Sequence, residues 1–136
     1  VVGGEAGENI TVGNFNVGMG SFALRNATDI SNVTAIGYKA LYDLTTGGSN
    51  TAVGGSAGEN LTTGGSNTLI GANAGDSMTD GSENVVIGRL AYQAGDNIGN
   101  TVIGYQAGYG ANQTGAIFIG WRAGWTNNAN SVVFIN

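Results

Sequence analysis

Apolar and polar residues alternate over short stretches of this chain, and the stretches recur at a nearly constant spacing. The segment Asn-Thr-Ala-Val-Gly at 50–54 is representative. Alternation with a period of two is typical of β-strands, whereas an amphipathic helix repeats every 3.6 residues. Residues that favour helices, such as Leu, Glu, Lys and Arg, are sparse. Each stretch is therefore predicted to be a short strand.

A dipeptide of a large aliphatic residue and glycine marks each repeat. Its spacing is 17 residues five times and then 16 twice, and an alanine follows each glycine by three residues. Segments such as 61–67 lie between the predicted strands and are rich in Gly, Asn, Ser and Thr, which form turns. A repeat this short cannot bury its own apolar face, so successive repeats must stack about 4.8 Å apart. The sequence predicts one all-β domain over residues 1–136, a parallel β-solenoid (β-roll) of about eight coils of 16–17 residues.

Three apolar columns are predicted to form the interior of the solenoid. The first is the aliphatic residue before each glycine, the second is the alanine column, and the third lies in the following turn. A small residue in every coil indicates that two walls approach closely there. The first two columns give the predicted core residues Ile36, Val53, Ile70, Ile87, Ile103, Ile119, Ala40, Ala57, Ala74 and Ala107. The third column is Ile10, Ala27, Leu44, Leu61 and Met78.

The strand position next to the aliphatic column is also apolar, and its residues should point to the opposite face. A strand that is apolar on both faces is normally covered on both, but a thin solenoid covers only one. We therefore expect self-association, although exposed apolar surface is also common on soluble proteins. The expected oligomer interface contains Leu69, Val86, Val102, Phe118 and Phe134.

The amino-acid composition argues against several classes of function. The chain has 26 Gly and no Pro, Cys or His, only 10% of its residues are charged, and its net charge is −5. Such a chain lacks the basic face that binds nucleic acid, and it has no apolar run near the roughly 20 residues that span a membrane. Without His or Cys, the familiar nucleophilic triads and zinc sites cannot form. We expect no enzyme activity, no catalytic residue, no metal and no cofactor.

Carboxylates and aromatic residues are the remaining candidates for chemistry. Paired carboxylates can hydrolyse glycosides or bind Ca²⁺, but the acidic residues at 5, 8, 76, 80 and 83 form no continuous column and are interpreted as solvated turn charges. Aromatic pairs recur one and five residues after the glycine, and in adjacent coils Tyr105 should lie over Trp121 and Tyr109 over Trp125. These four residues either pack between protomers or form a platform for the sugar rings of a surface glycan.

The motif that these columns share, Asn-Thr-x-Ile-Gly-x-x-Ala-Gly, occurs at 67–75 and 100–108. It resembles repeats of phage tail-fibre shafts and, less closely, head repeats of trimeric autotransporter adhesins. The resemblance covers nearly all 136 residues. It implies a left-handed β-roll assembled as a parallel homotrimer, in a virion tail fibre or on a cell surface outside the cell. The expected function is a structural or adhesive rod that presents contacts to a host surface, and the chain is expected to be a segment of a longer fibrous protein.

Two other functions remain open from the sequence. Strand register at both ends is compatible with a self-assembling extracellular filament. Two threonine columns suggest the hypothesis of an ice-binding solenoid, which requires both columns to lie side by side on one regular strand. The columns are Thr11, Thr28, Thr45, Thr62 and Thr79, and Thr34, Thr51, Thr68 and Thr101.

Overall fold

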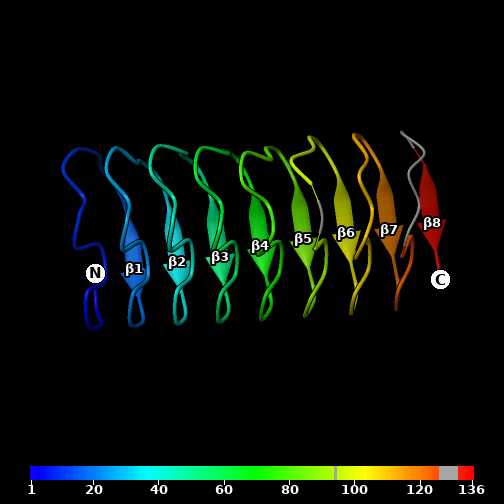
Figure 1. The fold of residues 1–136 in the computed structure, drawn as a ribbon, viewed down its shortest axis with the longest axis horizontal. Helices are drawn as coiled ribbons and strands as arrows, with labels where there is room; N and C mark the ends of the chain where they lie inside the picture. Colours follow the sequence, from blue (N-terminus) through cyan, green and yellow to red (C-terminus); the bar gives the residue numbers. More distant parts are fainter. Residues whose placement is uncertain (94, 126–131) are drawn as a thin grey trace.

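The computed structural model describes residues 1–93, 95–125 and 132–136. They form a row of eight short parallel strands, each joined to the next by one turn of the chain (Figure 1), with about seven turns of ~17 residues in all. The predicted all-β parallel β-solenoid is confirmed, and no helix occurs in the described ranges. The strands are β1 (Val17–Met19), β2 (Thr34–Ile36), β3 (Thr51–Val53), β4 (Thr68–Ile70), β5 (Val85–Ile87), β6 (Thr101–Ile103), β7 (Ile117–Ile119) and β8 (Val133–Ile135).

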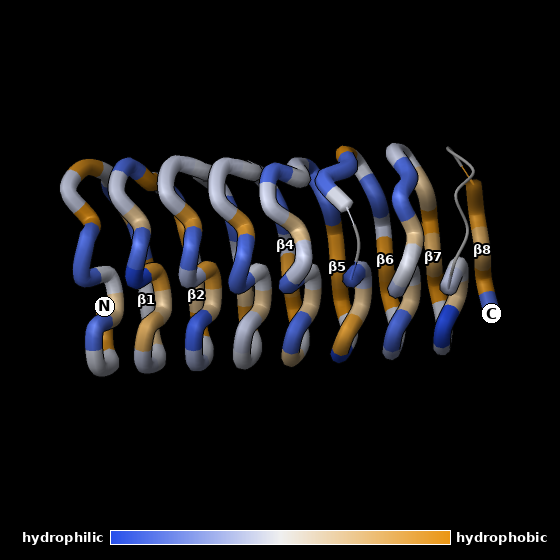
Figure 2. The backbone as a smooth tube through the Cα atoms, viewed as in Figure 1, coloured by the Kyte–Doolittle hydropathy of each residue, from blue (hydrophilic) through white to orange (hydrophobic). Residues whose placement is uncertain are grey.

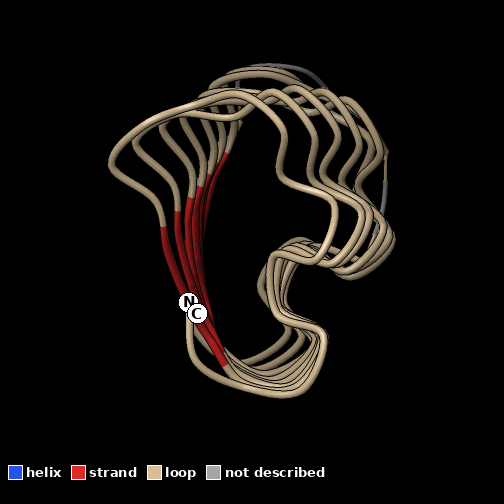
Figure 3. Ribbon diagram, turned by 90° about the vertical axis from the view of Figure 1, so that its left-hand side faces the viewer, coloured by secondary structure: helices blue, strands red, loops and turns tan. Residues whose placement is uncertain are grey.

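Neighbouring strands pair in strict register, so that each repeat position lies above its counterpart. Thr34 pairs with Thr51 and Thr51 with Thr68, and the same alignment runs through the sheet. Many loop residues are also hydrogen-bonded between coils, as in Leu41 N to Ala57 O at 3.0 Å. Viewed along the rod, the strands form one side of every coil and the loops form the rest (Figure 3). The backbone of most of each coil is therefore held by its neighbours.

The glycine after each strand allows the coils to approach closely. Gly54 has φ of +140°, and a Cβ there would lie 2.5 Å from the carbonyl oxygen of Gly71 in the next coil. Only glycine adopts such a backbone conformation without strain. The invariant glycine column thus follows from backbone contact between coils.

The structure reverses the predicted faces of the strands. The aliphatic residue before each glycine points outward, so Ile36 and Ile70 are each 37% exposed, while Leu69 between Thr68 and Ile70 is 0% exposed. The prediction that the aliphatic column forms the core is therefore wrong. The misplaced residues are Ile36, Val53, Ile70, Ile87, Ile103 and Ile119, all of which lie on the outer side of their strands and are exposed or partly exposed.

The predicted oligomer interface is wrong for the same reason. Leu69, Val86, Val102 and Phe118 are fully buried inside the coil, and the half-exposed Phe134 stacks on Phe118 with ring centroids 5.9 Å apart. Period-two alternation separates the two faces of a strand but does not say which face is inside. The alanine column and the third column were placed correctly: Ala40, Ala57, Ala74, Ala107, Ala27, Leu44, Leu61 and Met78 are all buried, and Ile10 packs against the core.

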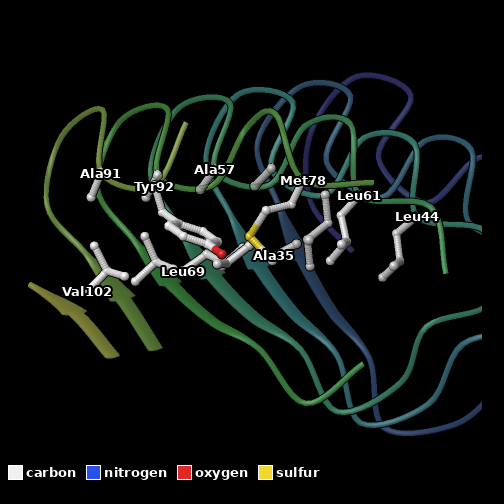
Figure 4. Packing of buried hydrophobic residues seen from close by; sticks show 14 of the residues in the cluster. Ala35, Leu44, Ala57, Leu61, Leu69, Met78, Ala91, Tyr92 and Val102 are labelled. Atoms are coloured by element: carbon white, nitrogen blue, oxygen red, sulfur yellow. The ribbon is translucent and has the colours of Figure 1, made fainter. Parts of the chain in front are cut away.

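Side-chain sizes compensate across the interior, which explains why the inner strand column begins with glycine and alanine. Gly18 lies beside Leu24, whereas the large Phe118 fills the space in front of Gly124, where a Cβ would come within 2.1 Å of its ring. Figure 4 shows Leu69, Tyr92 and Val102 reaching into the same continuous core. Because interiors are close-packed, a large residue on one wall requires a small one opposite.

A buried asparagine ladder runs through the middle of the rod. The side-chain oxygen of Asn50 accepts hydrogen bonds from the backbone N and Nδ2 of Asn67, at 2.9 and 3.1 Å. The side-chain oxygen of Asn67 accepts the same two hydrogen bonds from Asn84. The side-chain oxygen of Asn84 accepts them from Asn100, and the Oδ1 of Asn100 accepts a hydrogen bond from Ala116 N at 2.8 Å. Each Nδ2 also donates to a turn carbonyl of the next coil, such as Asn67 Nδ2 to Gly81 O at 2.8 Å. The ladder therefore fixes the turn before each strand.

Candidate functional sites: an apolar sheet face and an aromatic turn edge

Two surfaces stand out on the rod. The first, which we call the outer sheet face, consists of the two outward columns of the strands. In the view along the rod, no described loop packs over the outer side of the strands (Figure 3). The face is formed by Val17, Thr34, Thr51, Thr68, Val85, Thr101, Ile117 and Val133, with Met19, Ile36, Val53, Ile70, Ile87, Ile103, Ile119 and Ile135 beside them.

The outer sheet face is uncharged and mostly aliphatic. None of the strands β1 to β8 contains Asp, Glu, Lys or Arg, and the orange strand segments in Figure 2 mark the same row. Partly exposed residues in two columns over eight strands amount to on the order of 1,000 Å² of surface, against ~800 Å² per partner in a standard stable interface. Contiguous apolar patches larger than a few hundred Å² typically mark interaction sites.

The second surface, the turn edge, consists of the five residues that follow each strand-ending glycine. It lies along the lower rim in Figure 1, where the strand arrows point. All four cationic residues of the chain lie there: Arg25, Lys39, Arg89 and Arg122. Both tryptophans and all five tyrosines also lie on it, together with Phe22, although Tyr92 is buried. The turn edge thus gathers the basic and most of the aromatic side chains.

In the N-terminal part of the turn edge, the cations are neutralised by carboxylates. Arg25 Nε lies 2.7 Å from Glu5 Oε2 and 3.2 Å from Glu8 Oε2, and Lys39 Nζ lies 2.7 Å from Glu59 Oε1. The hydrogen bond with Glu59 raises the pKa of Lys39. Burial raises the pKa of Glu59, but hydrogen bonds from Lys39 and Ser56 lower it by more. These cations are satisfied within the protein.

Cations along the whole turn edge lie over aromatic rings, but in its C-terminal part they have no carboxylate partner among the described residues. Tyr109 stacks on Trp125 with centroids 4.6 Å apart and planes at 9°, as predicted. The guanidinium of Arg122 lies 4.1 Å from the ring centroid of Trp125 and 5.0 Å from that of Trp121. Tyr105 and Trp121, both among the described residues, make no stacking contact. Arg89 instead lies 5.8 Å from the Tyr105 ring, so the predicted stack of Tyr105 on Trp121 is replaced by cation–π contacts.

The threonine columns lie on different parts of the coil. Thr34 and its column are on the strands, whereas Thr28 and its column lie in loops, where their hydroxyls donate to the next coil, as in Thr28 Oγ1 to Thr45 O at 2.9 Å. The ice-binding hypothesis requires both columns to lie side by side on one strand. The two columns do not share a strand, so that requirement is not met.

Asp80 and Asp96, two of the acidic loop residues, are engaged in local hydrogen bonds. Asp80 accepts from the hydroxyls of Thr62 and Thr63 at 2.9 and 2.7 Å. Burial raises the pKa of Asp96, but its hydrogen bonds from the hydroxyl and backbone of Thr79 and from the backbone of Asp80 lower it by more. Within residues 1–93, 95–125 and 132–136 no group of His, Cys, Asp and Glu is placed to hold a metal ion.

Sequence reasoning missed two features of these sites. The asparagine ladder follows the repeat and was visible as a column, since an asparagine precedes the strand at 50, 67, 84 and 100. The cations form no such column, because Arg25, Lys39 and Arg89 stand at different repeat positions, so the repeat gave no signal for the cation–π pairs. The sequence did not show that this asparagine is buried, because polar residues before a strand usually lie in exposed turns.

Fold and surfaces together define a parallel β-solenoid repeat protein with one uncovered apolar sheet face. No family model, no curated protein and no solved structure matches the chain. In the described ranges, no helix is long and apolar enough to cross a membrane.

Proposed function

We propose that this chain is a structural and adhesive fibre segment that assembles with copies of itself through the outer sheet face. The observation that carries the proposal is the continuous apolar face along strands that are already covered on their inner side by the core. Burial of apolar surface is worth roughly 25 cal/mol per Å². An area on the order of 1,000 Å² per chain is enough to outweigh the cost of association.

A second copy of the same chain is the occupant that fits this face best. The outward residues repeat at the strand spacing of the rod, about 4.8 Å. A parallel copy offers the same spacing, so each coil meets an equivalent coil over the whole length. A globular partner has no such periodicity. The resemblance to tail-fibre shafts and trimeric adhesin heads favours three chains, and a parallel homotrimer is the assembly that we propose.

The proposed role is mechanical and extracellular. Hydrogen bonds between coils and the buried asparagine ladder make the rod stiff along its length. In a trimer the turn edges of three chains carry their aromatic and cationic residues together, and such multivalency converts weak contacts with a cell surface into strong attachment. The chain would thus act as a rod of a virion tail fibre or surface adhesin.

Light scattering coupled to size-exclusion chromatography tests the assembly. We expect a discrete trimer at micromolar concentration, and a monomer over that range would refute the proposal. Ile70→Asp places a charge on the outer sheet face and should dissociate the assembly. Ala72→Asp, at an exposed position of the turn edge, is the matched control and should leave the mass unchanged. Far-UV circular dichroism of both variants shows whether the fold is retained, because Ile70 is already partly exposed in the single chain.

A further inference from the structure

The C-terminal part of the turn edge differs in charge from the rest of this acidic protein. Its segments at 88–93, 104–109 and 120–125 contain Arg89 and Arg122 but no Asp or Glu, although the chain as a whole has a net charge of −5. Neither arginine has an ion-pair partner among the described residues, in contrast to Arg25 and Lys39. Two cations therefore stand without a carboxylate on one short stretch of the rod.

The guanidinium of Arg122 is held in place by a hydrogen bond and by two tryptophan rings. Its Nε donates to Gln106 Oε1 at 3.1 Å, and its central carbon lies 5.0 Å from the ring centroid of Trp121 and 4.1 Å from that of Trp125. In the part of the chain that the structure describes, neither terminal nitrogen of Arg122 has a hydrogen-bond partner. A guanidinium fixed in this way presents two parallel N–H donors, which is the geometry that binds a carboxylate in a bidentate manner.

Exposed aromatic rings surround these arginines. Trp121 is 60% exposed and Tyr105 is 38% exposed. Such rings bury apolar surface at low cost in conformational entropy, and their faces suit the C–H faces of sugar rings. Nothing in the described chain covers them.

We infer that this part of the turn edge binds a saccharide that carries carboxylate groups, such as a uronic acid polymer. Arg122 and Arg89 bind the carboxylates, and Trp121 and Tyr105 stack on the sugar rings. The inference rests on the proposed function, because the turn edge must face outward from the assembled rod. It adds the chemical class of the surface that the rod contacts.

Tryptophan fluorescence gives a specific assay, because the only two tryptophans of the chain, Trp121 and Trp125, are both at this site. The protein is titrated with short oligogalacturonates and, as a matched ligand, with the same oligomers fully methyl-esterified, which are neutral. We expect a saturable change with the acid form, an affinity that falls as salt is added, and at least tenfold weaker binding of the ester. Equal binding of both forms, or no saturable change with either, would overturn the inference.

Variants assign the contacts. Arg122→Gln and Arg89→Gln should each weaken binding by about tenfold, as expected for a lost charge-assisted hydrogen bond. Lys39→Gln, on the same edge but paired with Glu59, should change the affinity less than twofold. An equal loss in all three variants would indicate nonspecific attraction and overturn the site.

Light scattering on the same samples separates this inference from the proposed assembly. A monomer that still binds the acid oligomers would refute the trimer and support the site. A trimer that does not bind the acid oligomers would support the proposed assembly and refute the saccharide site. Trp121→Ala should abolish binding with no change in mass, and a loss of mass with unchanged affinity would show that the ring serves packing alone.

Discussion

The substitution Gly54→Ala isolates the contact that sets the spacing of the coils. Two penalties act together at this position. The φ of +140° belongs to a region that is accessible essentially to glycine alone, at a cost on the order of 1–3 kcal/mol for other residues. The added Cβ would also lie 2.5 Å from Gly71 O and 2.6 Å from Gly71 C, which are backbone atoms that cannot turn aside. Overpacking of this kind typically costs about 1–3 kcal/mol.

The neighbouring Gly55→Ala is the matched control. No atom lies within 4 Å of a Cβ built there, and its φ is not in the left-handed region. Other coils already carry Ala72 or Tyr38 at the same position. Alanine there should be neutral or stabilise by about 0.4–1 kcal/mol, because it restricts the unfolded chain.

The expected difference between the two variants is therefore about 2–7 kcal/mol, or roughly 8–28 °C in melting temperature at ~4 °C per kcal/mol for a domain of this size. Thermal unfolding followed by far-UV circular dichroism measures it, with all samples at one protein concentration, since self-association adds to apparent stability. If the two variants melt within about 2 °C of each other, close backbone contact does not explain the glycine column.

Three further predictions concern the asparagine ladder, a loop residue with positive φ and a buried tyrosine. Asn67→Val leaves the buried backbone N–H of Asn84 without its acceptor and should lower the free energy of unfolding in urea by about 2–4 kcal/mol. The control Asn60→Ala removes one exposed hydrogen bond and should lower it by less than about 1 kcal/mol. Equal losses in the two variants would contradict the role of the ladder. Ser66→Gly should stabilise the protein by about 0.5–1 kcal/mol, because Ser66 has φ of +60° and glycine already stands at this position in other coils; a lower melting temperature would count against left-handed strain. Burial raises the pKa of Tyr92 to about 12, so its stabilising contribution is complete below pH ~10, its ordinary pKa, and is lost as the pH rises towards 12. Unfolding between pH 9 and about 12 should show this loss in the native protein and not in Tyr92→Phe, and an identical decline in both would exclude Tyr92 as its source.

The sequence alone determined the architecture, because the repeat specifies it several times over. The alternation at 50–54, the fixed spacing of the glycines and the alanine three residues later were sufficient to predict parallel stacked coils. The alanine and third apolar columns were also placed correctly, since a small residue in every coil has no other explanation than close packing. The stack of Tyr109 on Trp125 followed from the same register.

Only the tertiary structure decided which side of each strand is the inside. The column of Ile70 is large and aliphatic in every coil, whereas the column of Leu69 begins with glycine and alanine, yet Leu69 is buried and Ile70 faces outward. The turn after the strand bends the chain towards the face of Leu69, and that bend depends on backbone angles that a pattern of residue types does not contain. Volume is then balanced by residues on the opposite wall, such as Leu24 opposite Gly18. The burial of the asparagines and the pairing of each cation could not be predicted from the sequence either, because both depend on where the loops lie relative to the next coil.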